Sequence, residues 1–166
     1  MDKTSDNRVQ VKGASARVRM KDPLFAPRKR KAAPFPFVLE ALAPLEPRTN
    51  VMFGCLAVYV GEKIVLILRD RPADTADNGV WIATTIDHHA SLRRKLPSLR
   101  SVQLFVQRFG KKETDWQVLP ADAADFEEAV LRACALILAR DPRIGKVPKG
   151  ISGRGAKTRR TSSGTC

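Results

Sequence analysis

A lysine beside a glycine-rich loop can hold the phosphates of a nucleotide, and the stretch GISGRGAKT at 150–158 has that composition. In a phosphate-binding loop the lysine directly follows the second glycine, whereas Ala156 separates Gly155 from Lys157 here. No predicted strand precedes the segment, and no helix-forming run follows it. The sequence therefore argues against nucleotide binding at this position.

Histidines and acids that could bind a metal or act in catalysis are few. His88 and His89 are adjacent, so on a helix their side chains diverge by about 100° and cannot share one metal ion. We expect both in solvent at a helix start.

Asp70, Asp74 and Asp77 lack the alternating ligands and closing Glu of a calcium loop and predict a polar, turn-rich loop. No Ser-His-Asp or Cys-His set can be assigned, so we predict no enzyme, no metal and no cofactor.

The cysteines indicate neither a disulfide framework nor a zinc site. Cys55, Cys134 and Cys166 are odd in number, and no two have Cys-x-x-Cys spacing. Cys55 falls in a predicted strand and Cys134 in a predicted helix, where a cysteine usually serves as a small buried apolar side chain.

Positive charge is confined to the two ends of the chain. The formal net charge is +13, to which residues 1–34 and 143–166 contribute +7 each, while residues 35–142 carry −1. Clustered cations release counterions from a nucleic-acid backbone and bind it without sequence preference. A protein partner, or a role in solubility alone, remains an alternative for these ends. The candidate phosphate-contacting residues are Arg28, Lys29, Arg30, Lys31, Lys146, Lys149, Arg154, Lys157, Arg159 and Arg160.

Both ends are also poor in apolar residues, whose burial must offset a backbone entropy cost of roughly 1–2 kcal/mol per residue. We therefore predict disordered basic tails at 1–34 and 143–166 and one folded domain at 35–142. No apolar run approaches the roughly 20 residues that cross a membrane, and the N-terminus lacks the apolar core of a signal peptide. We expect a soluble, cytoplasmic protein without a membrane partner.

The middle segment predicts a mainly antiparallel five-stranded sheet packed with three helices, a two-layer α+β domain. The element order rests on proline boundaries, apolar periodicity and turn residues. The predicted elements are a helix at 37–43, a hairpin of strands at 56–60 and 64–69, a strand at 80–84, a helix at 87–96, strands at 101–109 and 115–119, and a helix at 122–140.

Individual patterns refine this prediction. Strand 64–69 is apolar at nearly every position, which places it centrally in the sheet. Segment 101–109 alternates as a half-buried strand does. Thr84 or Thr85 is expected to cap the helix at 87–96. One apolar stripe of the last helix is expected to be core, and it comprises Phe126, Val130, Ala133, Cys134 and Ile137.

The run from Arg48 to Gly54, RTNVMFG, precedes the hairpin and is the most distinctive sequence element. With the Trp-containing third strand and the Leu-Pro before the last helix, it resembles the TfoX N-terminal domain over about 35–142. The resemblance implies that Met52 and Phe53 are packing residues, that Gly54 allows a close or positive-φ turn, and that the role is regulatory. Cys55 departs from the family, where a second glycine is common, and WIAT lacks a lysine that often follows the aromatic.

The full-length competence regulator of this family has a second, helical domain, whereas this chain ends in a basic segment, so its function cannot simply be transferred. We expect a non-enzymatic, TfoX-like regulatory or nucleic-acid-associated accessory protein whose basic tails contact phosphates. The alternative is a protein-interaction module that uses a sheet edge or surface of the folded domain, with the tails incidental.

Overall fold

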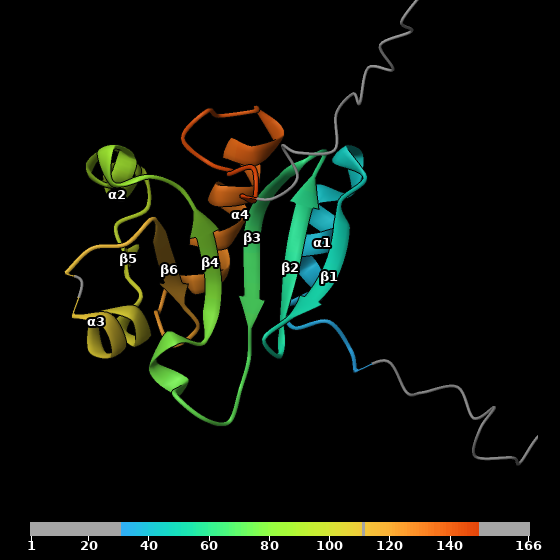
Figure 1. Cartoon of the computed structure of the whole chain (residues 1–166). Coiled ribbons are helices and arrows are strands. Elements are labelled where there is room, and N and C mark those ends of the chain that lie inside the picture. The colour runs from blue at the N-terminus through green and yellow to red at the C-terminus, as the bar shows by residue number, and fades with distance from the viewer. Residues whose placement is uncertain (1–30, 111, 150–166) are drawn as a thin grey trace, which may run out of the picture. The chain divides into compact units, whose positions relative to one another are not determined.

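The computed structural model describes residues 31–110 and 112–149 (Figure 1). This part of the chain forms an open antiparallel sheet of six strands with four α-helices. The α+β class is confirmed. The structure has one strand and one helix more than the predicted five strands and three helices. The strands are β1 (Arg48–Met52), β2 (Cys55–Val60), β3 (Lys63–Arg69), β4 (Gly79–Ala83), β5 (Arg100–Ser101) and β6 (Trp116–Pro120). The helices are α1 (Pro36–Leu42), α2 (His89–Lys95), α3 (Gln103–Phe109) and α4 (Phe126–Leu138).

The sheet has the order β1-β2-β3-β4-β6-β5. The predicted hairpin is confirmed as β2 and β3, which pair from Val60 and Lys63 at the turn to Leu56 and Leu68. As predicted, β3 is interior and buried from its second residue onward. The sequence analysis missed β1, which pairs with β2 along its whole length and forms one edge of the sheet.

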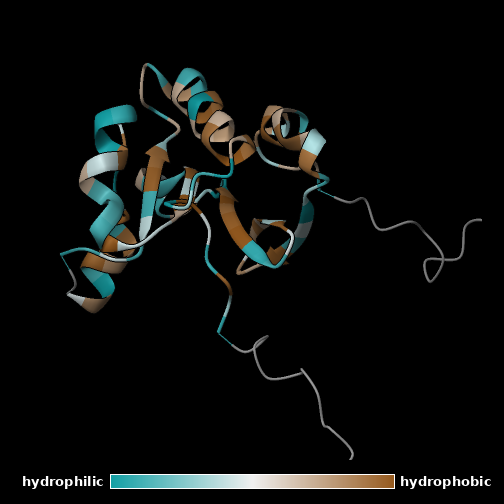
Figure 2. Ribbon diagram, turned by 90° about the horizontal axis from the view of Figure 1, so that it is seen from above, coloured by the Kyte–Doolittle hydropathy of each residue, from teal (hydrophilic) through white to brown (hydrophobic). Residues whose placement is uncertain are grey.

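One face of the sheet is covered over most of its area, and we call it the closed face. Helices α1 and α4 lie together on this side (Figure 2) and are joined by edge-on contacts of Phe35 and Phe37 with Phe126. The predicted stripe of α4 is confirmed as core, except that Phe126 is only half-buried. A fully buried leucine contributes about 1.5–3 kcal/mol, so this aliphatic core is the main source of stability. Its large members include Leu42, Leu66, Leu68, Ile82, Leu92 and Leu119.

The opposite face, which we call the open face, is covered only in part. It buries a smaller cluster that includes Ile67, Trp81 and Val118, and α3 packs against it through Leu104 and Phe105. The view of Figure 1 looks onto this face, because α1 and α4 lie behind the strands.

The prediction of a strand at 101–109 is wrong, because seven of these residues form α3. The two first backbone N–H groups of the helix, at Gln103 and Leu104, donate to the carboxylate of Asp77 at 3.0 and 2.7 Å. A carboxylate at a helix N-terminus satisfies otherwise unpaired N–H groups and favours the helix dipole. Gly110, with φ 63°, ends the helix in the left-handed region. A capping residue that is remote in sequence thus overrides the local alternation.

Other boundaries differ from the predictions. Helix α4 begins at Phe126 rather than at 122. Thr85 precedes a single 3-10 turn, Ile86–His88, which leads into α2, but its side chain makes no capping hydrogen bond. The Thr84 hydroxyl donates instead to the carbonyl oxygen of Arg143 at 2.7 Å.

The chain beyond the predicted domain boundary at 142 packs on the sheet as far as the structure describes it. Ile144 is buried, and Lys146 exchanges two backbone hydrogen bonds of 2.9 Å with Ile64 of β3. The N–H of Gly145 donates to Ala83 at the end of β4. Residues 143–147 therefore belong with the folded unit rather than with a basic tail. Across the described ranges, no helix has the length and apolar character needed to cross a membrane.

Candidate functional site

A cavity of about 570 Å³ opens on the open face, between the turn that joins β1 to β2 and helix α3. We call it the open-face groove. Its floor comes from strands and includes Cys55, Ile67 and Trp81. Its two rims are Met52 with Phe53 on one side and the helix residues Leu104, Phe105, Arg108 and Phe109 on the other, and Arg69, Arg71 and Asp74 close one end.

The first rim is a tight turn with an unusual residue. Phe53 and Gly54 form the two-residue connection between β1 and β2, with φ of 52° and 73°. Positive φ at both positions is the pattern of a type I′ hairpin turn, in which Asn-Gly is preferred. The predicted positive-φ role of Gly54 is confirmed, and Met52 is half-buried against the open-face cluster. The prediction that Phe53 is a core residue is wrong, because its side chain is 86% exposed.

The second rim carries a row of aromatic rings that runs from the floor to solvent. Trp81 in the floor is only 6% exposed, and its Nε1–H donates to the carbonyl oxygen of Asp77 at 2.8 Å. The ring of Phe105 meets that of Trp81 edge-on, with 5.6 Å between the ring centroids. Phe109 stacks on Phe105 with 6.1 Å between the centroids and 29° between the ring planes. Phe109 is 61% exposed. The outermost ring of the row, that of Phe109, is therefore accessible to solvent and packs on Phe105.

Arg69, at one end of the groove, is a structural cation. Its guanidinium is buried and donates to Asn78 Oδ1 at 2.7 Å and to the carbonyl oxygen of Ala73 at 3.1 Å. The same amide oxygen of Asn78 accepts from the N–H of Arg71, and its Nδ2 donates to the Arg71 carbonyl at 2.8 Å. These bonds fix the 70–78 loop, which is polar and turn-rich as predicted, at the end of the groove.

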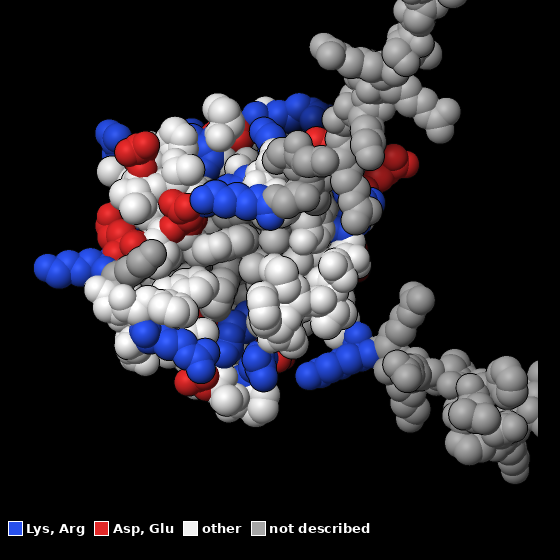
Figure 3. All heavy atoms as spheres, in the orientation of Figure 1, with Lys and Arg blue, Asp and Glu red and all other residues white. Residues whose placement is uncertain are grey.

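Two further arginines are available to a ligand. Arg71 is exposed and uses Nη1 to donate to the Phe53 carbonyl at 3.0 Å, so its charge lies at the turn that carries the exposed ring. Arg108 is exposed on α3, and none of its side-chain nitrogens takes part in a hydrogen bond or ion pair within the described residues. Lys and Arg side chains lie along both the upper and the lower parts of the open face (Figure 3).

Cys55 is the one side chain of the groove with nucleophilic potential. It is half-buried rather than fully buried, and its Sγ lies 3.8 Å from the Phe53 carbonyl oxygen. Burial raises the pKa of this thiol, and the charges of Arg69 and Arg71 oppose that shift only in part. Because the thiolate is the reactive form, the raised pKa disfavours reaction at this thiol.

His89 lies away from the groove, and the prediction that it faces solvent is wrong. It is 2% exposed, and neither ring nitrogen has a hydrogen-bond partner within the described part of the chain. Its Nδ1 is 3.9 Å from Oε1 of Glu113, which also pairs with Arg93 at 3.5 Å. Burial lowers the pKa of His89. Among the described residues, no three His, Cys, Asp or Glu side chains are grouped so that they could hold a metal ion.

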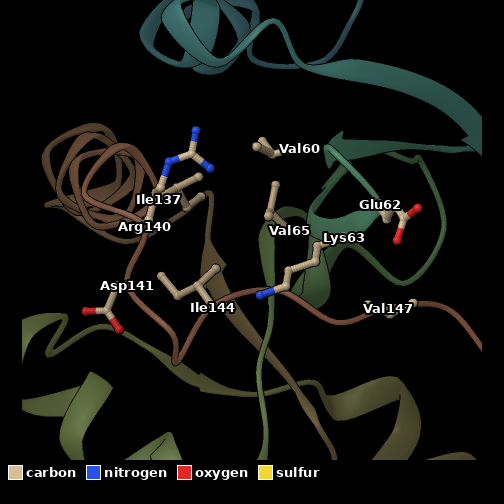
Figure 4. Close-up of a pocket in the computed structure, with 9 residues that line it drawn as sticks. All are labelled: Val60, Glu62, Lys63, Val65, Ile137, Arg140, Asp141, Ile144 and Val147. Atoms are coloured by element: carbon tan, nitrogen blue, oxygen red, sulfur yellow. The ribbon is translucent and has the colours of Figure 1, made fainter.

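A second cavity, of about 320 Å³, lies between the end of α4, the β2–β3 turn and the segment after α4. Figure 4 shows its apolar wall of Val65, Ile137 and Ile144, with Lys63 and Arg140 on different sides. Its rim also holds the acids Glu62 and Asp141, so it does not favour one sign of ligand charge. Asp141 is paired with Arg143 at 2.5 Å, and this contact lowers the pKa of the Asp141 carboxyl to about 2.

Of the predicted site residues that the structure describes, Met52 and Phe53 line the groove and Gly54 is next to them, while Lys31, Arg48, Lys146 and Lys149 are not among its lining residues. Lys31 and Lys149 are exposed, whereas the ammonium of Lys146 pairs with Asp115. Arg48 donates to the carbonyl oxygen of Gly61 at 2.7 Å. Outside the described residues lie Arg28, Lys29, Arg30, Arg154, Lys157, Arg159, Arg160, Cys166 and the GISGRGAKT stretch.

Sequence reasoning missed the second rim, although a signal for it exists. Leu104, Phe105, Arg108 and Phe109 have the spacing of one helical stripe, which becomes apparent once the segment is treated as a helix. No family model, no curated protein and no solved structure matches this chain.

Proposed function

We propose that this chain is a non-enzymatic, nucleic-acid-associated accessory protein. The observation that carries the proposal is the open-face groove, where the exposed rings of Phe53 and Phe109 lie beside exposed arginines. Aromatic faces and cations in one groove are the features by which proteins bind nucleic acid without reading its sequence. The basic ends of the sequence support the same partner, because they add phosphate contacts.

The ionisable groups of the groove favour binding over catalysis. They are three arginines, one aspartate and a thiol held in its neutral form, a set that offers positive charge but no pair matched for proton transfer. The resemblance of residues 48–54 to the TfoX N-terminal domain supports a regulatory role for such binding.

A protein-interaction module is the second candidate, and β1 favours it. This strand is an edge of the sheet, and Val51 on it is 73% exposed. An exposed edge offers backbone hydrogen bonds to an added strand from a partner. Contacts of this kind would depend little on salt.

The test is a titration of the full chain with a labelled single strand and a labelled duplex at two salt concentrations. We expect the logarithm of the affinity to fall linearly with the logarithm of salt, with a slope of about −0.7 per phosphate contact on the single strand and about −0.9 on the duplex. Replacing Arg28, Lys29, Arg30 and Lys31 together by Gln should weaken binding and make the dependence of affinity on salt less steep. Arg94→Gln, on an exposed position of α2, serves as the single-charge control. No binding of either nucleic acid at low salt would exclude the proposal and leave the interaction module.

A further inference from the structure

We propose that the open-face groove binds unpaired bases of a single strand, with Phe53 and Phe109 as stacking faces and Arg71 and Arg108 as phosphate contacts. This proposal rests on the proposed function and goes beyond it, because contacts from basic segments alone make little distinction between a single strand and a duplex.

The first argument is the backbone of Phe53. A bulky residue at positive φ is an outlier, and the first position of a type I′ turn strongly prefers Asn, Asp or Gly. The ring does not compensate by burial, since it is 86% exposed. Neither the turn nor the core explains this phenylalanine. Strained residues that persist without a folding reason occur at binding sites, which is where the groove places Phe53.

The second argument is the match between the two rims. Phe109 is accessible and stacked on Phe105, which in turn contacts Trp81, so its ring is presented on a fixed support. Phe53 lines the same cavity from the opposite rim. Every nucleobase has a flat face, so two such rings accept bases of any sequence.

The third argument is the placement of charge. Arg71 is anchored to the Phe53 carbonyl at 3.0 Å, and Arg108 lines the same cavity as Phe109, so each rim of the groove carries an exposed arginine. A strand whose bases stack on the rings would bring its phosphates to these cations. In a duplex the base faces are covered by neighbouring pairs, and exposing them costs a few kcal/mol. The groove therefore selects unpaired nucleotides over duplex.

The test uses the full chain, a labelled 12-nucleotide oligothymidine and a blunt duplex of the same length, followed by fluorescence anisotropy. Phe53→Asn and Phe109→Ala should each weaken single-strand binding at least about fivefold, which corresponds to 1 kcal/mol at 1.4 kcal/mol per tenfold. Duplex binding should change less than about twofold. Because Asn suits the turn, loss of folding cannot account for the effect of Phe53→Asn.

Matched controls separate the groove from general surface effects. Leu131→Ala removes an exposed apolar side chain of α4 and should leave both affinities unchanged. Arg108→Gln should weaken single-strand binding more than Arg94→Gln, although each removes one exposed charge. Oligothymidine should also quench the tryptophan fluorescence of the chain, to which Trp81 in the groove floor and Trp116 both contribute, and Phe53→Asn should reduce that quenching.

The outcomes distinguish this proposal from the one on which it rests. If neither oligonucleotide binds at low salt, both proposals fail. If both bind and Phe53→Asn weakens neither, the groove proposal is overturned while nucleic-acid association through the basic segments stands. Binding of an acidic, aromatic peptide that depends on Phe53, without binding of oligothymidine, would also overturn it and assign the groove to a protein partner.

Discussion

Along β3, Leu66 and Leu68 belong to the core of the closed face, whereas Ile67 between them belongs to the open face. The closed face is mainly aliphatic, and helices cover most of it. The open face has fewer aliphatic residues and more aromatic ones, and arginines border the part that α3 leaves uncovered. One strand thus serves both a core and a groove, because successive side chains of a strand point to opposite faces.

The difference shows which parts of the molecule folding explains. Side chains of the closed face are accounted for by burial alone. On the open face, exposed Phe53 and Phe109 contribute little to packing, and the polar contacts of Asp77, Asn78 and Arg69 hold the segments that carry them. The closed face is therefore expected to respond to substitution through stability, and the groove through binding.

The largest expected effect is on the closed face. Leu66→Ala should lower the free energy of unfolding by about 2–5 kcal/mol, because Leu66 is fully buried and its removal leaves a cavity. Ile67→Ala, the adjacent residue on the open face, should cost less, because the space it leaves joins a groove that water can enter. Denaturant unfolding of both variants measures the comparison. Equal losses would show that the open face is as tightly packed as the closed one.

Asp77 is expected to have the next largest effect, because it positions the helix of the groove. Its carboxylate is 2% exposed, caps α3 and pairs with Arg100 at 3.1 Å. Asp77→Ala should cost about 2–3 kcal/mol, near the lower end for breaking a buried ion pair, because Arg100 keeps some contact with solvent. Asp70→Ala, at an exposed position of the same loop that takes part in no salt bridge within the described residues, is the control and should change stability little. Faster amide exchange in α3 would identify the helix as the element that loosens.

These contacts also explain which parts of the structure the sequence predicts. The hairpin of β2 and β3, the central position of β3 and the core stripe of α4 depend on local periodicity and were predictable from it. Helix α3 was not, since its cap comes from Asp77, 26 residues before Gln103. Alternating apolar residues fit a short helix as well as a strand when the deciding contact is remote.

The site was harder to predict than the fold. Phe53 was expected in the core because the family resemblance of residues 48–54 implied a packing role, and the sequence does not reveal that the turn places it outside. The opposite error occurred at His89, whose polarity predicted solvent although tertiary packing buries it. At His89 the exposure is set by the packing of distant elements, which local patterns do not contain.

A smaller effect, which depends on pH, is expected from the buried His89 of α2. Burial lowers the pKa of His89, opposed by Glu113 and Asp115 and assisted by Arg93. Its neutral form therefore stabilises the fold above the unfolded pKa of about 6.5, and this contribution is lost as the pH falls through the lowered value. His89→Leu should flatten the loss of stability between pH 7 and pH 5.

Leu131→Ala, which removes an exposed side chain that does not titrate, is the control and should leave that slope as it is. Asp141 does not interfere, because its pKa of about 2 places its own loss of stability at much lower pH. An unchanged slope in His89→Leu would mean that His89 titrates alike in the folded and unfolded chain.

The smallest expected effect concerns the turn at the rim of the groove, and its sign is opposite to the others. Phe53 adopts φ 52° and is largely exposed, so replacing it by Asn removes backbone strain and little packing. Phe53→Asn should raise the free energy of unfolding by up to about 1 kcal/mol, the scale on which a non-glycine residue is penalised in the left-handed region. Phe53→Ala lacks the preference of Asn for this region and should give little or no gain. Denaturant unfolding of the two variants beside the native chain makes the measurement. If both lower stability by several kcal/mol, Phe53 packs in solution, and the contrast between a closed face built for folding and an open face built for binding does not hold at this residue.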